Sequence, residues 1–69
     1  MQIKVNGKDW QCAPGTTVAD LLSYYKIPPQ VSVVEVNGLI IPRENYSQIW
    51  LGEGDVVEVV RFMAGGGIA

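Results

Sequence analysis

The chain has 69 residues, 48% of them hydrophobic and 17% charged, with a formal net charge of −2. These values are typical of one small globular domain and exclude an intrinsically disordered chain. The five basic residues are scattered along the sequence and form no run that could follow a phosphate backbone, so we expect no nucleic-acid partner.

The N-terminal residues predict a β-hairpin. Gln2 to Asn6 alternates polar and apolar side chains, and Asn6-Gly7 is the strongest short hairpin signal. Lys8 to Cys12 is the expected returning strand, in which Trp10 and Cys12 share a face. We therefore interpret Cys12 as a small buried hydrophobic residue rather than a reactive thiol.

A helix of about two turns is predicted next. Thr17 has the position of an N-cap, and Asp20 follows three residues later as the acid of a capping box. One apolar stripe that must lie on a sheet comprises Val18, Leu21, Leu22 and Tyr25, while Tyr24 falls on its flank. Pro28 and Pro29 are expected to end the helix.

A second hairpin follows the helix. Val31 to Val36 predicts a strand, and Asn37-Gly38 turns it into a short partner, Leu39 to Ile41, which ends at Pro42. The next segments are an irregular polar crossing (43–48), a brief strand or the end of that crossing (49–51), and a turn (52–55).

The last predicted strand is Val56 to Phe62. Its residues are apolar and β-branched at nearly every position, which predicts a strand covered on both sides. The glycines of Met63 to Ala69 have much backbone entropy to lose and no side chains to compensate for it. We expect a folded domain over residues 1–63 and a flexible glycine tail over residues 64–69.

This order of elements predicts an α+β fold. Two hairpins flanking one helix, followed by a final strand, give a mixed sheet of four or five strands with the helix packed across one face. The first and last strands are expected to be central and parallel. This arrangement is the β-grasp fold, and it places the tail on an exposed arm.

Catalytic residues are not apparent in the sequence. It contains no histidine and a single cysteine, and its acidic residues lack metal-ligand spacing. We therefore expect a protein that is not an enzyme and binds no cofactor. The longest apolar runs are far shorter than a membrane span, and Met1-Gln2-Ile3-Lys4 starts a strand without a signal-peptide pattern, so we expect a cytoplasmic protein without a membrane partner.

The tail offers one reactive group, a terminal carboxylate. Activation as an acyl-adenylate requires the peptide to enter a narrow channel of another enzyme. Glycine suits this task because it has no Cβ and leaves the acyl carbon unhindered. On composition alone, a frayed terminus or a cloning remnant is the favoured interpretation of the glycines.

The chain resembles the ThiS-like sulfur carrier proteins of thiamine biosynthesis over essentially its whole length. The motifs that carry this resemblance are Thr17 to Leu22, Val34 to Gly38, Ile41-Pro42-Arg43, Leu51 to Val60 and Gly65-Gly66-Gly67. The individual turns are common in small β proteins, whereas their order and spacing before the glycines are specific.

The resemblance implies a ubiquitin-like β-grasp fold and a cycle of sulfur transfer. An adenylating enzyme related to ubiquitin activators would use ATP and magnesium to adenylate the terminal glycine. Sulfur from the persulfide of a cysteine desulfurase would give a thiocarboxylate, which a thiazole synthase would consume. On this chain Gly67 would carry the sulfur, with Gly66 and Gly65 before it.

One feature departs from the family pattern. Family members end at the diglycine, whereas Ile68 and Ala69 follow Gly67 here. We expect a protease to remove these two residues and expose Gly67, as in related carriers that serve cysteine or homocysteine synthesis.

A carrier also needs an apolar patch beside its arm. The residues expected to bind partners are Ile40, Ile41, Leu51, Arg61, Phe62 and Met63, although core packing is the alternative for the apolar ones. Arg43 is a further candidate for guiding docking, or an ordinary surface charge.

Two other functions remain open. One is a sulfur carrier for cysteine, homocysteine or molybdopterin synthesis, and the chain is short for the last of these. The other is a non-covalent β-grasp interaction module in which the glycines are a frayed end.

Overall fold

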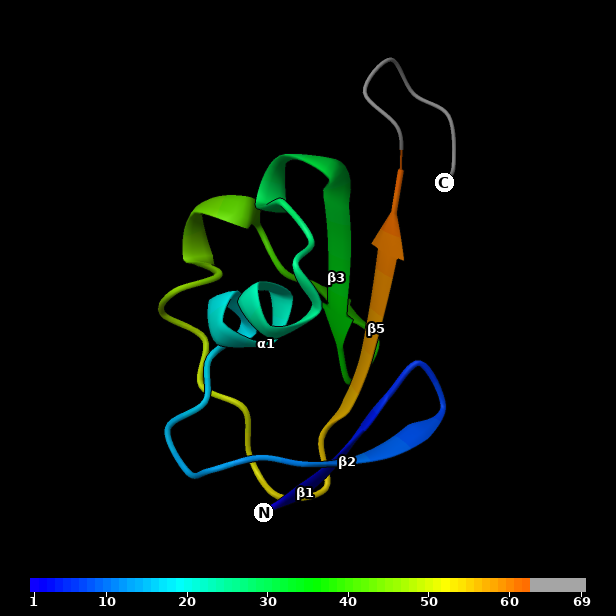
Figure 1. Cartoon of the computed structure of the whole chain (residues 1–69), viewed down its shortest axis with the longest axis vertical. Coiled ribbons are helices and arrows are strands. Elements are labelled where there is room, and N and C mark those ends of the chain that lie inside the picture. Colours follow the sequence, from blue (N-terminus) through cyan, green and yellow to red (C-terminus); the bar gives the residue numbers. More distant parts are fainter. Residues whose placement is uncertain (63–69) are drawn as a thin grey trace.

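One helix lies across one face of a five-stranded sheet (Figure 1). The computed structural model describes residues 1–62. Their elements are β1 (Gln2–Val5), β2 (Lys8–Gln11), α1 (Val18–Tyr25), the 3-10 turn η1 (Pro29–Val31), β3 (Ser32–Val36), β4 (Leu39–Ile40), the 3-10 turn η2 (Arg43–Asn45) and β5 (Val56–Arg61).

The strand order is β2-β1-β5-β3-β4. β1 pairs with β5 in parallel, and the other neighbours are antiparallel. The last strand therefore occupies the middle of the sheet beside the first, as the sequence predicted. The α+β class and the β-grasp arrangement are confirmed, with five strands rather than four.

Both hairpins turn at Asn-Gly dipeptides, as predicted. Asn6 and Asn37 have φ angles of 51° and 53°, and Gly7 and Gly38 have φ angles of 82° and 84°. Two successive residues with positive φ form the turn whose twist matches that of the flanking strands.

α1 begins at a complete capping box. The Thr17 hydroxyl accepts a hydrogen bond from the Asp20 amide, and the Asp20 carboxylate accepts one from the Thr17 amide. The helix ends before the prolines, because Lys26 adopts a left-handed conformation (φ 59°) and Ile27 donates back to the Leu22 carbonyl.

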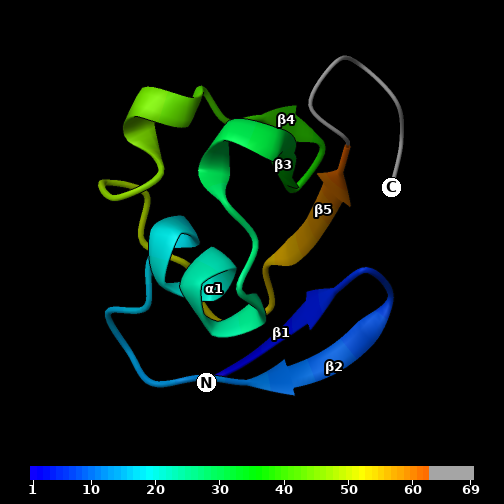
Figure 2. The ribbon, with the colours of Figure 1, turned by 45° about the horizontal axis from the view of Figure 1, so that its top comes forward.

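The helix covers one face of the sheet, and η1 and η2 lie on the same side (Figure 2). The core between these layers consists of Ile3, Val5, Val18, Leu21, Leu22, Val34, Val36, Tyr46, Leu51 and Val57. The prediction that Tyr25 belongs to the core stripe was wrong, because its side chain is 42% exposed.

The last strand is covered on one face, which corrects the prediction of a strand covered on both. Val57 is fully buried, whereas Val56 and Val60 are each 46% exposed. In a two-layer fold, side chains that alternate away from the helix have no layer to pack against. The β-branched composition of β5 therefore reflects strand propensity on its outer side.

Two other segments can be compared with the prediction. Trp50 forms an isolated bridge with Thr17 and residues 49–51 contain no strand, so of the two predicted alternatives this segment is the end of the crossing. β2 stops at Gln11, and Cys12 is half-buried against the core rather than fully buried.

Candidate functional site

β5 carries the glycine-rich tail, and both of its neighbours hold it. β3 pairs with it from Ser32↔Arg61 to Val36↔Val57. β1 pairs over the two positions Lys4↔Val56 and Val5↔Val57. The tail therefore follows a strand that is paired along both edges in the middle of the described sheet.

The asparagines of the two hairpin turns extend these ladders. The Asn6 side chain donates from Nδ2 to the Val59 carbonyl at 3.2 Å and accepts from the Val59 amide at 2.8 Å. On the other edge, Asn37 accepts from the Val56 amide at 2.9 Å and donates to the Asp55 carboxylate at 3.0 Å. Each turn thus replaces a missing backbone partner of β5 by a side-chain amide.

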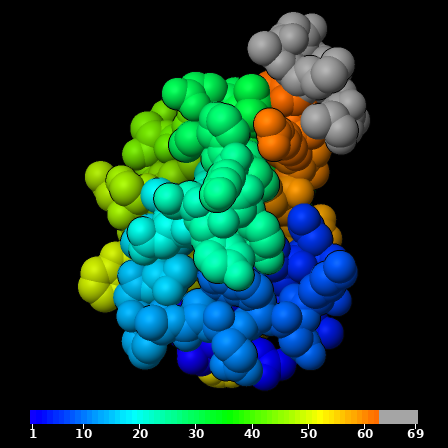
Figure 3. Space-filling view, in the orientation of Figure 1, coloured from blue at the N-terminus to red at the C-terminus, as the bar shows by residue number. Residues whose placement is uncertain are grey.

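The described part of the chain ends just after β5. The Phe62 amide donates to the Val31 carbonyl at 2.8 Å, and the Phe62 side chain is half-buried. Figure 3 shows the end of β5, in orange, at the molecular surface. Met63, Gly65, Gly66 and Gly67 lie outside the described residues, as does the predicted boundary after residue 63.

The predicted partner-binding residues differ in their exposure. Ile40 on β4 is 67% exposed, Arg61 is exposed, and Ile41 is half-buried against the core. Leu51 was placed wrongly, because it is 4% exposed and belongs to the core. Its amide donates to the Thr16 carbonyl at 2.8 Å, which holds the 49–51 segment against the start of α1.

The guanidinium of Arg43 forms hydrogen bonds to backbone carbonyls of the folded domain. Its Nε donates to the Pro29 carbonyl at 2.8 Å and its Nη2 donates to the Gln30 carbonyl at 3.4 Å. The guanidinium thereby ties η2 to the segment that enters β3. These contacts favour the surface-charge alternative over a role in docking.

The sequence analysis did not predict that the face of the sheet opposite α1 is exposed. Val33 and Val60 form a cross-strand pair on it, and Glu35 lies directly opposite Glu58. The alternation of Val56, Glu58 and Val60 along β5 is the signal that could have revealed this face.

Three aromatic rings form another surface cluster that the sequence analysis did not predict. Trp10 packs edge-on against Tyr24 with a centroid distance of 5.2 Å, and Tyr24 packs edge-on against Tyr25 at the same distance. Tyr24 is 66% exposed. The mutual packing accounts for the position of Tyr25 outside the core.

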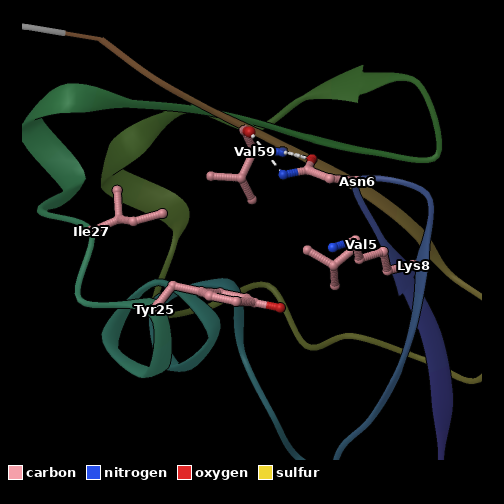
Figure 4. Close-up of a pocket in the computed structure, with 6 residues that line it drawn as sticks. All are labelled: Val5, Asn6, Lys8, Tyr25, Ile27 and Val59. Atoms are coloured by element: carbon pink, nitrogen blue, oxygen red, sulfur yellow. Dashed lines mark hydrogen bonds between the residues drawn. The ribbon is translucent and has the colours of Figure 1, made fainter. Parts of the chain in front are cut away.

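A pocket of about 210 Å³ opens on the helix side of β5 (Figure 4). Its lining consists of Val5, Asn6, Lys8, Tyr25, Ile27 and Val59. The Asn6 amide already bonds to Val59 there, and the lining contains one ammonium group, one phenol and no carboxylate. This set lacks the paired nucleophile and base of a catalytic site.

Residues 1–62 contain no cluster of three or more His, Cys, Asp or Glu side chains arranged to hold a metal ion. Within the same residues no helix is long and apolar enough to cross a membrane.

The sequence matches the model of the ThiS family over residues 3–66. It is 39% identical over 66 residues to the sulfur carrier protein ThiS of Bacillus subtilis, which covers 93% of this chain and 98% of that protein. It is also 36% identical over 66 residues to a thiazole synthase of Magnetococcus marinus, where the match covers 96% of this chain and 20% of that protein.

The fold agrees with a solved structure. The crystal structure of the thiamine biosynthesis protein ThiS from Geobacter metallireducens superposes with a TM-score of 0.80 and 36% sequence identity. That similarity covers 96% of this chain and all of the other.

Proposed function

The chain belongs to the ThiS family of sulfur carrier proteins of thiamine biosynthesis, and on this premise we propose that Gly67 bears the sulfur as a C-terminal thiocarboxylate. The observation that carries the proposal is the position of β5. This strand is paired on both sides and leads directly into Met63-Ala64-Gly65-Gly66-Gly67. A folded body whose central strand continues into a tail with an unhindered acyl group is suited to presenting that group to a partner enzyme.

The chemistry is supplied by partner enzymes. An adenylating enzyme with ATP and magnesium joins the Gly67 carboxylate to the α-phosphorus of ATP and releases pyrophosphate. A persulfide, formed by a cysteine desulfurase, then attacks the acyl carbon and displaces AMP. Reduction of the resulting acyl disulfide by a thiol leaves the thiocarboxylate on Gly67. This chain contributes the acyl group and leaves its carbonyl carbon accessible to the nucleophile, because glycine shields neither face of the carbonyl.

A thiazole synthase is the proposed recipient of the sulfur. The synthase of Magnetococcus marinus includes a segment similar to nearly all of this chain. A carrier and a synthase within one polypeptide act at high effective concentration, which is useful when one consumes the product of the other. We propose that this chain and a separate thiazole synthase chain form the same kind of carrier–synthase pair.

The position of the acceptor requires a processing step. Gly67 is followed by Ile68, so its carboxylate exists only after hydrolysis of that peptide bond. A protease that removes Ile68-Ala69 is therefore part of the proposal. Because the family match ends at Gly66, Gly66 is the alternative acceptor that the test must separate from Gly67.

The test uses two purified chains, one ending at Gly67 and one ending at Gly66. Each is incubated with the adenylating enzyme, ATP, magnesium, cysteine desulfurase, cysteine and a thiol reductant. We expect intact-mass analysis to show sulfur replacing oxygen in the chain that ends at Gly67, and more slowly or not at all in the chain that ends at Gly66. Equal modification of both would overturn the choice of Gly67.

Loss of sulfur incorporation in both chains would contradict the carrier chemistry itself. The chain that ends at Ala69 is the matched control, because it keeps the folded body and lacks a terminal glycine. Its modification at Ala69 would remove the need for a protease.

A further inference from the structure

Among the described residues, Asn6 is the last one that bonds to β5 on its β1 side. Its backbone amide donates to the Val57 carbonyl at 2.9 Å, and its side chain makes the two bonds to Val59 that Figure 4 shows. Asn6 thus binds two positions of β5 whose peptide groups face β1. No other described residue forms a hydrogen bond on this edge of β5 nearer to Phe62.

The next position on that edge has no partner within residues 1–62. The Phe62 amide donates to the Val31 carbonyl on β3's side, and alternate residues of a strand direct their peptide groups to opposite edges. The peptide groups of Arg61 therefore face the β1 side, where no bond between described residues reaches them. β5 is thus held from both sides as far as Val59, and from β3 alone between Val59 and Phe62.

The hairpin turn alone does not require asparagine at position 6. Such two-residue turns accept glycine, aspartate or asparagine where φ is positive, and Asn6 has a φ of 51°. Of these three residues, only asparagine has an N–H donor and a carbonyl acceptor in one planar group. That group bonds to both backbone groups of Val59 at once. The residue type therefore suits the contact with β5 in addition to the turn.

We propose that Asn6 is a positioning residue for activation of the tail, because it fixes the point at which the chain can leave the sheet. The proposal rests on the sulfur-carrier function above and assigns a residue of the folded domain to it. An enzyme that takes up a chain end must order every residue that is free beforehand. By holding Val59, Asn6 keeps β5 in its strand conformation up to Phe62 before the enzyme binds. Asn6 acts through β5 and not on the acyl group.

Asn37 offers a matched control, because it has the same place in the other Asn-Gly turn. Its φ is 53°, and its side chain accepts a hydrogen bond from the Val56 amide. Val56 is the first residue of β5, at the opposite end of the strand from Phe62. Asn37→Gly therefore removes a comparable amide contact on the same strand and leaves the contacts at Val59 in place.

The test compares Asn6→Gly, Asn6→Asp and Asn37→Gly in chains that all end at the residue the wild type needs for activation. Glycine keeps the positive φ. Aspartate keeps the acceptor for the Val59 amide and removes the donor to the Val59 carbonyl. Pyrophosphate release by the adenylating enzyme with ATP and magnesium gives kcat and KM for each carrier, under conditions in which near-ultraviolet circular dichroism shows it folded. Hydrogen exchange of the Phe62 amide is followed in the free carriers.

We expect Asn6→Gly to raise KM about three- to tenfold with kcat unchanged, because the strand end must be ordered on binding and not in the chemical step. Asn6→Asp should raise KM by a smaller factor. Asn37→Gly should keep the wild-type KM, which a purely structural role of both asparagines does not predict. The Phe62 amide should exchange faster in Asn6→Gly than in Asn37→Gly, although its own acceptor is the Val31 carbonyl in both.

A wild-type KM in Asn6→Gly would overturn the inference, as would an equal rise in KM for both glycine variants, since the effect would then follow general stability. If Asn6→Gly does not fold, a wild-type KM in Asn6→Asp has the same meaning. Equal Phe62 exchange in the two glycine variants would also overturn it. Failure of the wild-type chain to release pyrophosphate would instead refute the proposed function. The exchange measurement needs no partner enzyme, so the two failures are distinguishable.

Discussion

The side-chain amide of Asn6 pairs with the backbone of Val59 as a peptide group would. Its Nδ2 donates to the Val59 carbonyl and its Oδ1 accepts from the Val59 amide, at 3.2 and 2.8 Å. β1 ends at Val5, so this amide continues the ladder on β5 after the backbone of β1 has turned away. One residue therefore both makes the hairpin turn and holds the strand that bears the tail.

Replacement of Asn6 by glycine separates these two roles. Glycine keeps the positive φ of the turn but removes both hydrogen bonds to Val59. We expect a loss of about 1–3 kcal/mol in the free energy of unfolding, measured by urea denaturation, and faster hydrogen exchange at the Val59 amide. An unchanged Val59 exchange rate would show that the side chain does not hold β5.

The capping box predicts a cost for Thr17→Ala. The variant leaves the Asp20 amide without its side-chain acceptor, and we expect it to lower the free energy of unfolding by about 1 kcal/mol. Ser23→Ala, at an exposed position within the same helix, is the control and should have little effect. Equal thermal stability of the two variants would contradict the role of the cap.

Truncation of Leu51 should cost much more stability than truncation of Ile40. Leu51→Ala opens a cavity in the core and should cost about 2–5 kcal/mol of stability. Ile40→Ala removes an exposed side chain and should change stability by less than about 0.5 kcal/mol. Chemical denaturation of both variants distinguishes the two positions, and similar losses would place Ile40 in the core as well.

The two arginines near the candidate site should also differ. Arg43→Gln removes guanidinium bonds to the Pro29 and Gln30 carbonyls and should lower stability by about 1 kcal/mol. Arg61→Gln, at an exposed position, should leave stability unchanged. The comparison is made by thermal unfolding, and a more stable Arg43 variant would refute the tie between η2 and the chain before β3.

Local sequence signals predicted the elements of this fold well. The Asn-Gly dipeptides, the Thr17–Asp20 capping box and the β-branched run at Val56 each act within a few residues, so their outcome depends little on the rest of the molecule. The parallel pairing of the first and last strands followed from topology. The capping box and the turns were therefore found where the sequence placed them.

Burial across layers was harder to predict. Leu51 and Tyr25 are both large and apolar enough for the core, and their actual positions depend on which segments pack beside them. The Leu51 backbone is held by its bond to Thr16, whereas Tyr25 packs on the half-buried ring of Trp10 and the exposed ring of Tyr24. The opposition of Glu35 and Glu58 depends on register, which no single strand encodes.

The central position of β5 has a mechanical consequence. An enzyme that draws the tail into a channel pulls along the strand axis, while the backbone bonds to β3 are perpendicular to that axis. The force therefore acts in shear on the β3 ladder, the β1 pairing and the two asparagine amides. These bonds share the load and do not break one after another. The folded domain can thus resist a pulling force that is applied at the C-terminal end of β5.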